Sequence, residues 1–496
     1  MTSSTHPSGD ARIILHIGTG SFHRAHQAWY LQKLRETGNA DALTWSIAAG
    51  NIRSDMNPTH EALAAQNGAY TLETVTPDGV RTYECIRSIQ RVLPWSPDHA
   101  ALIEYGSSRA CRIISFTVTE SGYYLDNHDR LDTAHPDITV DLDGGSTTIY
   151  GALAAILDAR RQADGGPVTL QCSDNLRHNG EKFRTGFFEF LAHRNLTELR
   201  QWVEANTTTP SAMVDRITPR PTPDIRERVL VATGFDDHCP VMSESFAQWV
   251  IEDHFVAGRP AWEKAGAELV DSVLPYEEAK IRVLNATHSC IAWAGALAGF
   301  EYIHEGTRDA EIARFAYDYV TQDVIPSLLP SPIDLDRYRD VVLDRFGNPD
   351  IRDTNDRVAA DGFTKLSGFI APTLRDCFAR DTVPSATAML PALFLGFLTR
   401  WIDGELRIEY RDSRHDLTAI RAMLAADDPV AVFCSDRRVW GDLAGDARLV
   451  DAVRNASSQV NQWLAARSAR AGGARGHLLT VSGESEIMTK KEIDLT

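Results

Sequence analysis

The sequence predicts an α/β fold over about residues 1–270, followed by a mostly α-helical part over residues 271–496. Two apolar runs, Arg12–Ile17 and Trp45–Gly50, are separated by a glycine-containing turn and a stretch of helical periodicity. This succession of strand, helix and strand has the spacing of a βαβ unit, in which the two strands lie parallel. Beyond about residue 270 the 3.6-residue period of helices replaces such runs, which predicts a separate helical part.

The remaining elements follow from the same two patterns. Continuous apolar runs predict further strands at residues 112–119 and 168–172, and an apolar stripe predicts a helix at residues 149–161. In the second part, helical periodicity predicts helices at residues 276–300, 310–321, 384–402, 417–425 and 446–466. Pro275 precedes the first of these helices, so we place the domain boundary between residues 270 and 271.

Composition excludes several classes of function. The 496 residues include 50 Lys and Arg against 68 Asp and Glu, which gives a formal net charge of -18. This charge has the wrong sign for a protein that binds nucleic acid or an anionic membrane surface. The seven cysteines are scattered without a Cys-x-x-Cys pair, and the first ten residues contain no basic and apolar signal segment. These features predict a cytoplasmic protein without a disulfide framework or zinc knuckle, and they imply no protein partner.

Residues 382–399 form an uncharged, apolar segment whose length is borderline for a membrane span. Pro384, Pro391 and Gly396 interrupt this segment, and no second segment of the sequence resembles it. We therefore expect a buried helix of a soluble fold rather than a membrane helix.

The turn after the first strand has the residues that a phosphate-binding turn needs. Gly18 allows a sharp turn, and Gly20 lacks the Cβ that would keep a pyrophosphate away from the following helix N-terminus. The third position of the usual glycine fingerprint is His23, so an ordinary tight turn is the alternative. The position directly after the first strand favours a Rossmann-type dinucleotide-binding domain.

Asp55 is the candidate partner of the adenosine ribose, which predicts NAD as the cofactor. It lies 35 residues after Gly20, beyond the usual ~20, and Arg53 could instead attract the 2′-phosphate of NADP. His23 and His26 are three residues apart, as metal ligands can be, but the sequence places no third ligand near them. We expect these two histidines to be polar groups at a helix start, and we expect no metal.

The segment from Pro275 to His288 carries groups that are suited to alcohol oxidation. On a continuous helix, Asn285 and His288 share a face, and Lys280 lies about 7.5 Å before Asn285. Lys280 could accept a hydroxyl proton if burial and a cationic cofactor lower its pKa, Asn285 could donate to the resulting oxyanion, and His288 could orient a hydroxyl. Glu277, one turn before Lys280, could relay the proton to water. A solvated helix face is the alternative interpretation.

Six separated motifs stand in order along the chain. They are residues 17–26 (IGTGSFHRAH), 117–123 (TVTESGY), 172–180 (CSDNLRHNG), 213–219 (MVDRITP), 248–253 (QWVIED) and 275–288 (PYEEAKIRVLNATH). Together they resemble the polyol-specific long-chain dehydrogenases, the mannitol dehydrogenase family, over nearly the whole chain. The sequence departs from that family at Ser121, where Gly-Gly-Tyr is usual, and at Ala286 and Thr287, where many members have Gly-Ser.

The resemblance implies an extended Rossmann-type domain and a helical substrate domain that work without a metal. It also implies roles for five residues around the reacting hydroxyl. Lys280 is expected to be the general base, and Asn175 and Asn285 are expected to form the oxyanion hole. His288 is expected to bind the substrate, and Glu277 to relay the proton.

The resemblance further implies substrate and cofactor contacts. Asp215 and Arg375 are expected to bind polyol hydroxyls. From the residues alone, a salt bridge from Asp215 to Arg216 or Arg220 is the alternative. The expected cofactor-binding residues are Gly18, Gly20, Ser21, Phe22, Asp55 and Glu120.

The expected activity is the NAD-dependent oxidation of a secondary hydroxyl of a pentitol or hexitol to a ketose. D-arabinitol oxidised to D-xylulose is the first candidate reaction. Oxidation of mannitol at position 2 and reduction of a hexuronate are alternatives on the same scaffold. A catalytically silent dinucleotide sensor is an alternative from a different class.

Overall fold

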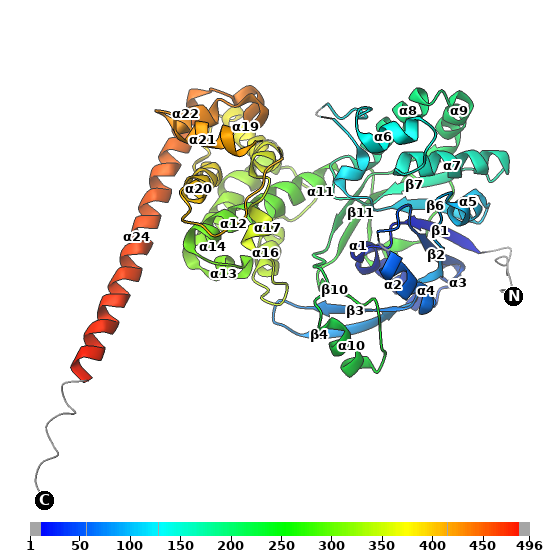
Figure 1. The fold of residues 1–496 in the computed structure, drawn as a ribbon, viewed down its shortest axis with the longest axis horizontal. Helices are drawn as coiled ribbons and strands as arrows, with labels where there is room; N and C mark the ends of the chain where they lie inside the picture. Colours follow the sequence, from blue (N-terminus) through cyan, green and yellow to red (C-terminus); the bar gives the residue numbers. More distant parts are fainter. Residues whose placement is uncertain (1–10, 56, 127, 414, 486–496) are drawn as a thin grey trace, which may run out of the picture. The chain divides into compact units, whose positions relative to one another are not determined.

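The structure is a computed structural model that describes residues 11–55, 57–126, 128–413 and 415–485 (Figure 1). The chain forms two compact units, which we call the N-terminal unit (Met1–Glu277) and the C-terminal unit (Glu278–Thr496). The N-terminal unit combines strands with helices, and the described part of the C-terminal unit is helical (Figure 1).

The N-terminal unit is built on a parallel sheet of six strands. In spatial order the strands are β5 (Ile89–Val92), β2 (Trp45–Gly50), β1 (Arg12–Ile17), β6 (Cys111–Phe116), β7 (Val168–Cys172) and β8 (Thr207–Thr208). Counted along the chain, this is the order 3-2-1-4-5-6 of dinucleotide-binding folds. The prediction of a Rossmann-type domain is therefore confirmed.

The strands predicted at residues 12–17, 45–50 and 168–172 coincide with β1, β2 and β7. The strand predicted at residues 112–119 ends earlier, at Phe116. Beyond Phe116 the N–H groups of Val118 and Thr119 donate to the carboxylate of Asp174, at 2.9 and 2.8 Å, instead of to a neighbouring strand.

Two small sheets complete the strands of this unit, and the sequence patterns predict neither. One contains β10 (Val241–Glu244), β3 (Tyr70–Val75) and β4 (Arg81–Ile86), and the other contains β12 (Glu268–Val270), β11 (Gln248–Glu252) and β9 (Ala212–Asp215). Three of these strands, β9, β10 and β12, have only three or four residues. β3 and β4 pair as neighbours along the chain, but the strand added to them comes from far away in the sequence, since Val241 pairs with Leu72. Local periodicity carries little information about such pairing.

Helices cover both faces of the six-stranded sheet. The helical elements described in this unit are α1 (Ser21–Ala25), α2 (Gln27–Glu36), α3 (Ala40–Thr44), α4 (Asn57–Ala65), α5 (Ala100–Ser107), η1 (Glu120–Tyr123), α6 (Pro136–Leu142), α7 (Ile149–Gln162), α8 (Asn179–His193), α9 (Thr197–Asn206), α10 (Ile225–Thr233), which packs on the small sheet of β3, β4 and β10, and η2 (Trp262–Ala265). Leu15 and Leu170 pack in one core with side chains of α5, α7 and α8, and Ile14 and Ile47 pack in another with side chains of α1 and α2. Burial on both faces explains why these strands read as continuous apolar runs.

The C-terminal unit begins at Glu278, within α11 (Leu274–Ala279). Its elements are η3 (Lys280–Asn285), α12 (Ala286–Ala298), α13 (Ile303–Arg308), α14 (Ala310–Asp318), η4 (Tyr319–Val324), α15 (Ile325–Leu328), α16 (Leu335–Phe346), α17 (Asn355–Ala359), α18 (Gly362–Lys365), η5 (Leu366–Ile370), α19 (Ala371–Ala379), α20 (Ser385–Ile402), α21 (Leu417–Leu424), α22 (Pro429–Cys434), α23 (Arg437–Trp440), η6 (Gly441–Leu443) and α24 (Ala447–Ser485). The prediction of a mostly helical C-terminal part is therefore confirmed. α12 is buried on nearly every side and packs against α13, α14, α17 and α20, so it forms the centre of this unit.

α20 contains most of the apolar segment at residues 382–399 that raised the question of a membrane span. Among the described helices it is the one that is long and apolar enough to cross a membrane by length and composition. Of its apolar window, 67% is buried inside the fold, and α20 packs against α12 and α24. This burial agrees with the predicted core helix.

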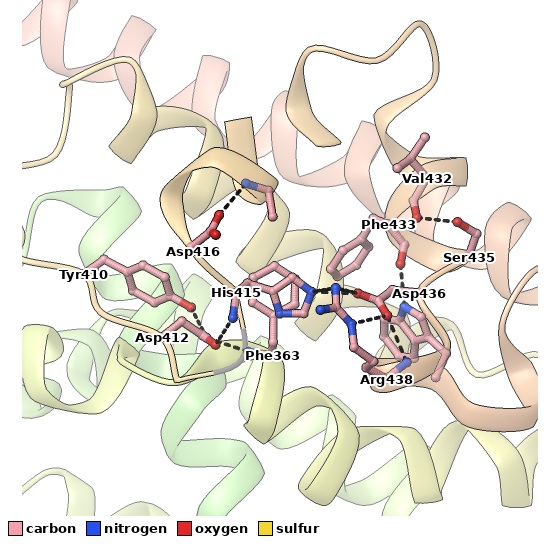
Figure 2. A network of polar contacts seen from close by, with 12 residues as sticks. Phe363, Tyr410, Asp412, His415, Asp416, Val432, Phe433, Ser435, Asp436 and Arg438 are labelled. Carbon is pink, nitrogen blue, oxygen red and sulfur yellow. Dashed lines mark hydrogen bonds and ion pairs between the residues drawn. The ribbon is translucent and has the colours of Figure 1, made fainter. Parts of the chain in front are cut away.

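A polar network fastens the stretch between α20 and α24 to the rest of the C-terminal unit (Figure 2). The Tyr410 hydroxyl donates to Asp412 at 2.6 Å, and Asp412 also accepts the backbone N–H of Phe363, outside this stretch, at 3.1 Å. The Nε2 atom of His415 lies 2.6 Å from a carboxylate oxygen of Asp436, and the His415 ring stacks on Phe363 of α18 at 3.8 Å between centroids. Phe363 itself is buried in the core of the unit, so the network holds this stretch in one place.

Candidate active site

The turn between β1 and α1 has the shape that a pyrophosphate needs. Gly18 has a φ of +110°, and a Cβ there would lie 2.7 Å from the carbonyl oxygen of Thr117, so only glycine fits. A Cβ on Gly20 would meet nothing within 4 Å, which means that this glycine borders open space just before Ser21 and Phe22 begin α1. That space is left to a phosphate group, so the turn fits a dinucleotide.

His23 fills the third position of this turn by ring stacking. Its ring lies almost flat on the ring of His16 in β1, with 3.3 Å between centroids, and both side chains are buried. Burial lowers the pKa of His16 to about 3 and the pKa of His23 well below its usual value, so both rings are neutral. The Nε2 atom of His26 lies 2.9 Å from the carbonyl oxygen of Gln248. Within the described residues, no three His, Cys, Asp or Glu side chains gather as a metal ion would require.

The chain after β2 holds the two candidates for contact with the ribose. The side chain of Asn51 accepts hydrogen bonds from the N–H and the hydroxyl of Thr19, at 2.9 and 3.1 Å, and so ties this edge to the glycine turn. Arg53 donates to a carboxylate oxygen of Asp137 at 2.6 Å. Asp137 therefore compensates the charge of Arg53, and Asp55 is exposed. The ribose contact of Asp55 stays a prediction.

Asp174 anchors the two loops that follow β6 and β7. Besides the two backbone N–H groups beyond Phe116, its carboxylate accepts the Tyr123 hydroxyl at 3.1 Å. Burial raises the pKa of Asp174 to about 6, although these hydrogen bonds oppose the shift. The two anchored loops carry the predicted site residues Glu120 and Asn175. The Asn175 side-chain N–H donates to Glu120 at 3.3 Å, which joins the two loops.

Replacing Asp174 tests this anchor. Asp174→Ala leaves two backbone N–H groups without an acceptor, so the free energy of unfolding is expected to fall by about 2–4 kcal/mol. Asp174→Asn can keep both bonds and is expected to cost less.

Because the folded pKa of about 6 lies above the unfolded value of 3.8, the folded state binds more protons between these values. Native stability from this group is therefore lost as pH rises from about 4 to about 6, and the Asn variant should lack that loss.

Urea unfolding of the native protein and both variants across this pH range measures the effect. An alanine variant as stable as the asparagine variant would contradict the anchoring role.

Asp215 ends β9, and its side chain is buried. The neighbouring Arg216 donates to the carbonyl oxygens of Glu244 and Ala25, at 3.1 and 2.6 Å, and its guanidinium lies over the ring of Trp29. Arg216 is one of the two arginines that the alternative interpretation paired with Asp215, and these contacts hold its guanidinium elsewhere. The polyol contact of Asp215 stays a prediction.

Glu277 is buried in α11, and both of its carboxylate oxygens accept the backbone N–H of His178, at 3.1 and 3.2 Å. Burial raises the pKa of Glu277, and the hydrogen bond from His178 opposes this shift. A carboxyl group with a raised pKa exchanges protons closer to neutral pH. This property suits the predicted proton relay.

Lys280 and Asn285 are the first and last residues of a π-helical turn, η3. The N–H of Ala286 bonds the carbonyl of Ile281, five residues back, so the predicted continuous α-helix is wrong at this point. In an α-helix, residues five apart point about 140° away from each other. A bond over five residues instead brings such residues one turn apart, so Lys280 and Asn285 point more nearly the same way than α periodicity predicts.

His288, in α12, is joined to polar groups of later segments. Its Nε2 atom lies 3.3 Å from Asp353, and its ring stacks on Phe346 at 4.4 Å between centroids. Burial lowers the pKa of His288, so the ring is neutral and can both donate and accept a hydrogen bond. Asp353 also pairs with Arg357 at 2.5 Å, and burial lowers the pKa of the nearby Lys365 to about 8.

The sequence patterns miss Asp353, Arg357 and Lys365, because the packing of α12 against α17 and α18 brings them to His288 and no motif marks them. Arg375, which was predicted instead, donates through Nε to Asp442 at 2.9 Å, and both side chains are exposed. Its predicted contact with a polyol stays a prediction.

The family of the chain is decided by two matches that together span most of its length. A model of the mannitol dehydrogenase Rossmann domain matches residues 12–264, and a model of the mannitol dehydrogenase C-terminal domain matches residues 272–461. The chain belongs to the mannitol dehydrogenase family. The resemblance found in the sequence motifs is therefore confirmed.

Two relatives in the mannitol dehydrogenase family cover almost the same length. D-arabinitol 4-dehydrogenase of Ralstonia nicotianae is 65% identical over 457 residues, which are 92% of this chain and 98% of the relative. D-arabinitol 4-dehydrogenase of Klebsiella pneumoniae is 53% identical over 446 residues, which are 90% of this chain and 97% of the relative.

A solved structure of the mannitol dehydrogenase family has the same fold. It is the Pseudomonas fluorescens mannitol 2-dehydrogenase in a ternary complex with NAD and D-mannitol. The two structures superpose with a TM-score of 0.78 at 33% identity, covering 95% of this chain and 94% of that one.

Proposed function

We propose that this protein is an NAD-dependent dehydrogenase that oxidises a secondary hydroxyl of a sugar alcohol to a ketose, with D-arabinitol to D-xylulose as its reaction. The observation that carries the proposal is the 65% identity to the D-arabinitol 4-dehydrogenase of R. nicotianae over 92% of the chain. The local geometry supports it, because Gly18 and Gly20 form a turn that fits a dinucleotide and the π turn carries Lys280 and Asn285.

The cofactor would be held by residues of the N-terminal unit. Gly18, Gly20, Ser21 and Phe22 would hold the pyrophosphate at the turn, and Asp55 would accept hydrogen bonds from the ribose. Glu120 would contribute from the loop that Asp174 anchors. When bound, NAD supplies the acceptor for the hydride that leaves the oxidised carbon.

The residues around the reacting hydroxyl transfer its proton and stabilise the negative charge on its oxygen. Lys280, in its uncharged form, accepts the hydroxyl proton on Nζ. Asn285 donates its amide N–H to the oxygen as negative charge develops there, and Asn175 is proposed to do the same. His288 orients a neighbouring hydroxyl through its neutral ring. Glu277 passes the proton on to water, which restores the base.

Asp215 and Arg375 are proposed to bind further hydroxyl groups of the polyol. The reaction needs no metal in this proposal, because the lysine amine takes the proton and the carboxamides stabilise the oxyanion.

Mannitol oxidation at position 2 and hexuronate reduction are second candidates on the same scaffold. The D-mannitol-bound relative shares 33% identity with this chain, much less than the D-arabinitol relatives share. A hexuronate would need a cation for its carboxylate, and Arg357 and Lys365 lie near His288. A silent dinucleotide sensor would have no use for a buried lysine beside a carboxamide.

A substrate panel tests the proposal. D-arabinitol, D-mannitol and a hexuronate are each assayed with NAD and NADP or their reduced forms, by the absorbance of the reduced nicotinamide. We expect the highest kcat/KM for D-arabinitol with NAD, because Asp55 repels a 2′-phosphate. A higher value with the hexuronate or with NADP would contradict the proposed substrate or cofactor, and no turnover with any of them would favour the sensor.

A further inference from the structure

Three π turns interrupt the described helices of the C-terminal unit. In each, the N–H group that closes the turn bonds the carbonyl five residues back rather than four. These bonds run from Ala286 to Ile281, from Ile325 to Val320 and from Ala371 to Leu366. A turn of this kind needs a local cause, because the four-residue bond is the ordinary state of a helix.

Proline provides that cause in two of the three turns. Pro326 and Pro372 directly follow the residues that close the second and third turns. Proline has no N–H to donate, and its ring clashes with the carbonyl four residues back, so the α register is closed to it. At the corresponding position after the first turn the chain has Thr287, and α12 contains no proline. The turn that carries Lys280 and Asn285 therefore has another cause.

The backbone of this first turn passes over one carbonyl. Its last π bond uses the carbonyl of Ile281, and α12 begins at Ala286. In the α-helix that resumes there, the N–H of Thr287 is expected to bond the carbonyl of Val283, four residues back, which passes over the carbonyl of Arg282. Arg282 is buried, and an unpaired carbonyl in such a place is unfavourable.

Tyr319 supplies the missing donor. Its hydroxyl donates to the carbonyl oxygen of Arg282 at 3.0 Å, and its side chain has no exposed surface. Tyr319 begins the second π turn, which packs against the first. The guanidinium of Arg282 is held separately by Glu278, at 2.8 Å, and by Asp376. The backbone and the side chain of Arg282 are thus both fixed.

We propose that Tyr319 is a positioning residue whose hydroxyl stabilises the passed-over carbonyl of Arg282 and so selects the π register between Lys280 and Asn285. Without this bond the α register is favoured, which turns the two side chains about 140° apart. The base and the oxyanion donor then no longer act on one hydroxyl. The consequence for catalysis rests on the proposed function of Lys280 and Asn285.

The variant Tyr319→Phe tests the inference, because it removes the hydroxyl and keeps the ring. We expect kcat for D-arabinitol to fall by about 10- to 100-fold, as for other small misplacements of reacting groups. The KM for the polyol and the affinity for NADH are expected to change little, since neither depends on the register of the base. Native kcat in this variant would overturn the proposal.

A second variant imposes the register by the means that the other two turns use. In Tyr319→Phe/Thr287→Pro, proline follows the residue that closes the turn, as Pro326 and Pro372 do. This double variant is expected to recover most of the lost kcat. A folded double variant that stays as slow as Tyr319→Phe would show that the hydroxyl does not act through the register, and would overturn the proposal.

A control variant separates positioning from simple loss of stability. Tyr410→Phe also removes a buried hydroxyl from the C-terminal unit, where it bonds Asp412, and is expected to keep the native kcat.

Amide hydrogen exchange gives a readout that does not depend on activity. The exchange rate of the Ala286 amide should change in Tyr319→Phe, because its acceptor changes from the Ile281 carbonyl to the Arg282 carbonyl. An unchanged rate would contradict the inference even if the native protein oxidised no polyol. Inactivity of the native protein alone would instead contradict the proposed function.

Discussion

Replacing Lys280 by alanine is expected to lower kcat for polyol oxidation by about 10²- to 10⁴-fold, the range that a general base contributes. The affinity for NADH should be nearly unchanged, because the glycine turn that fits the dinucleotide lies in the N-terminal unit. Steady-state rates and a fluorescence titration with NADH measure the two quantities separately.

Two further observations make this test specific for the amine. In the native protein, kcat/KM should rise with pH as the base loses its proton, and Lys280→Ala should lose that rise. A small primary amine added to the alanine variant should restore part of the rate, because it can accept the same proton. The exposed Lys264 offers a matched control, and Lys264→Ala should behave as the native protein does. Activity of Lys280→Ala close to the native value would remove the lysine from its role.

Replacing Asn285 by alanine is expected to lower kcat by about 10²- to 10³-fold, the cost of removing one donor to a developing oxyanion. The backbone at this position is held independently, since the Ser289 hydroxyl donates to the Asn285 carbonyl at 3.0 Å. The loss should therefore come from the amide group and not from unwinding of the helix. Equal melting temperatures of the native protein and the variant would confirm that separation.

Asn285→Asp sharpens the test, because it keeps the shape of the side chain and replaces a donor with a negative charge. If Asn285 faces the oxyanion, this variant should be slower than Asn285→Ala, with KM for the polyol changed less than kcat. An aspartate variant faster than the alanine variant would place Asn285 away from the developing charge.

The sequence was sufficient to predict those elements of the fold that depend on a local pattern of residues. β1, β2 and β7 are buried on both faces, so each reads as a continuous apolar run whose ends are visible. The turn after β1 needs glycine at position 18, because φ is positive there and a Cβ would collide with the Thr117 carbonyl. This requirement makes the turn recognisable from the residue type. The small sheets were invisible because strands such as β9, with four residues, gain their structure from distant partners.

The sequence predicted which residues belong to the candidate site. It did not predict how their side chains are arranged. The sequence predicted a continuous helix from Lys280 to His288, but the chain forms a π turn there, and the carbonyl of Arg282 in that turn accepts a hydroxyl from Tyr319 in another helix. In the same way, Asp353 reaches His288 only through the packing of α17 on α12. Contacts of this kind leave no trace in local periodicity.

The burial of α12 restricts where new substrate preferences can arise. A substitution on a helix enclosed by four others disturbs close packing on several sides at once. The side chain of Arg357 in α17 is instead 68% exposed, so it can be exchanged without repacking a core. A laboratory search for variants that accept other sugars would gain most by randomising that position and leaving the central helix untouched.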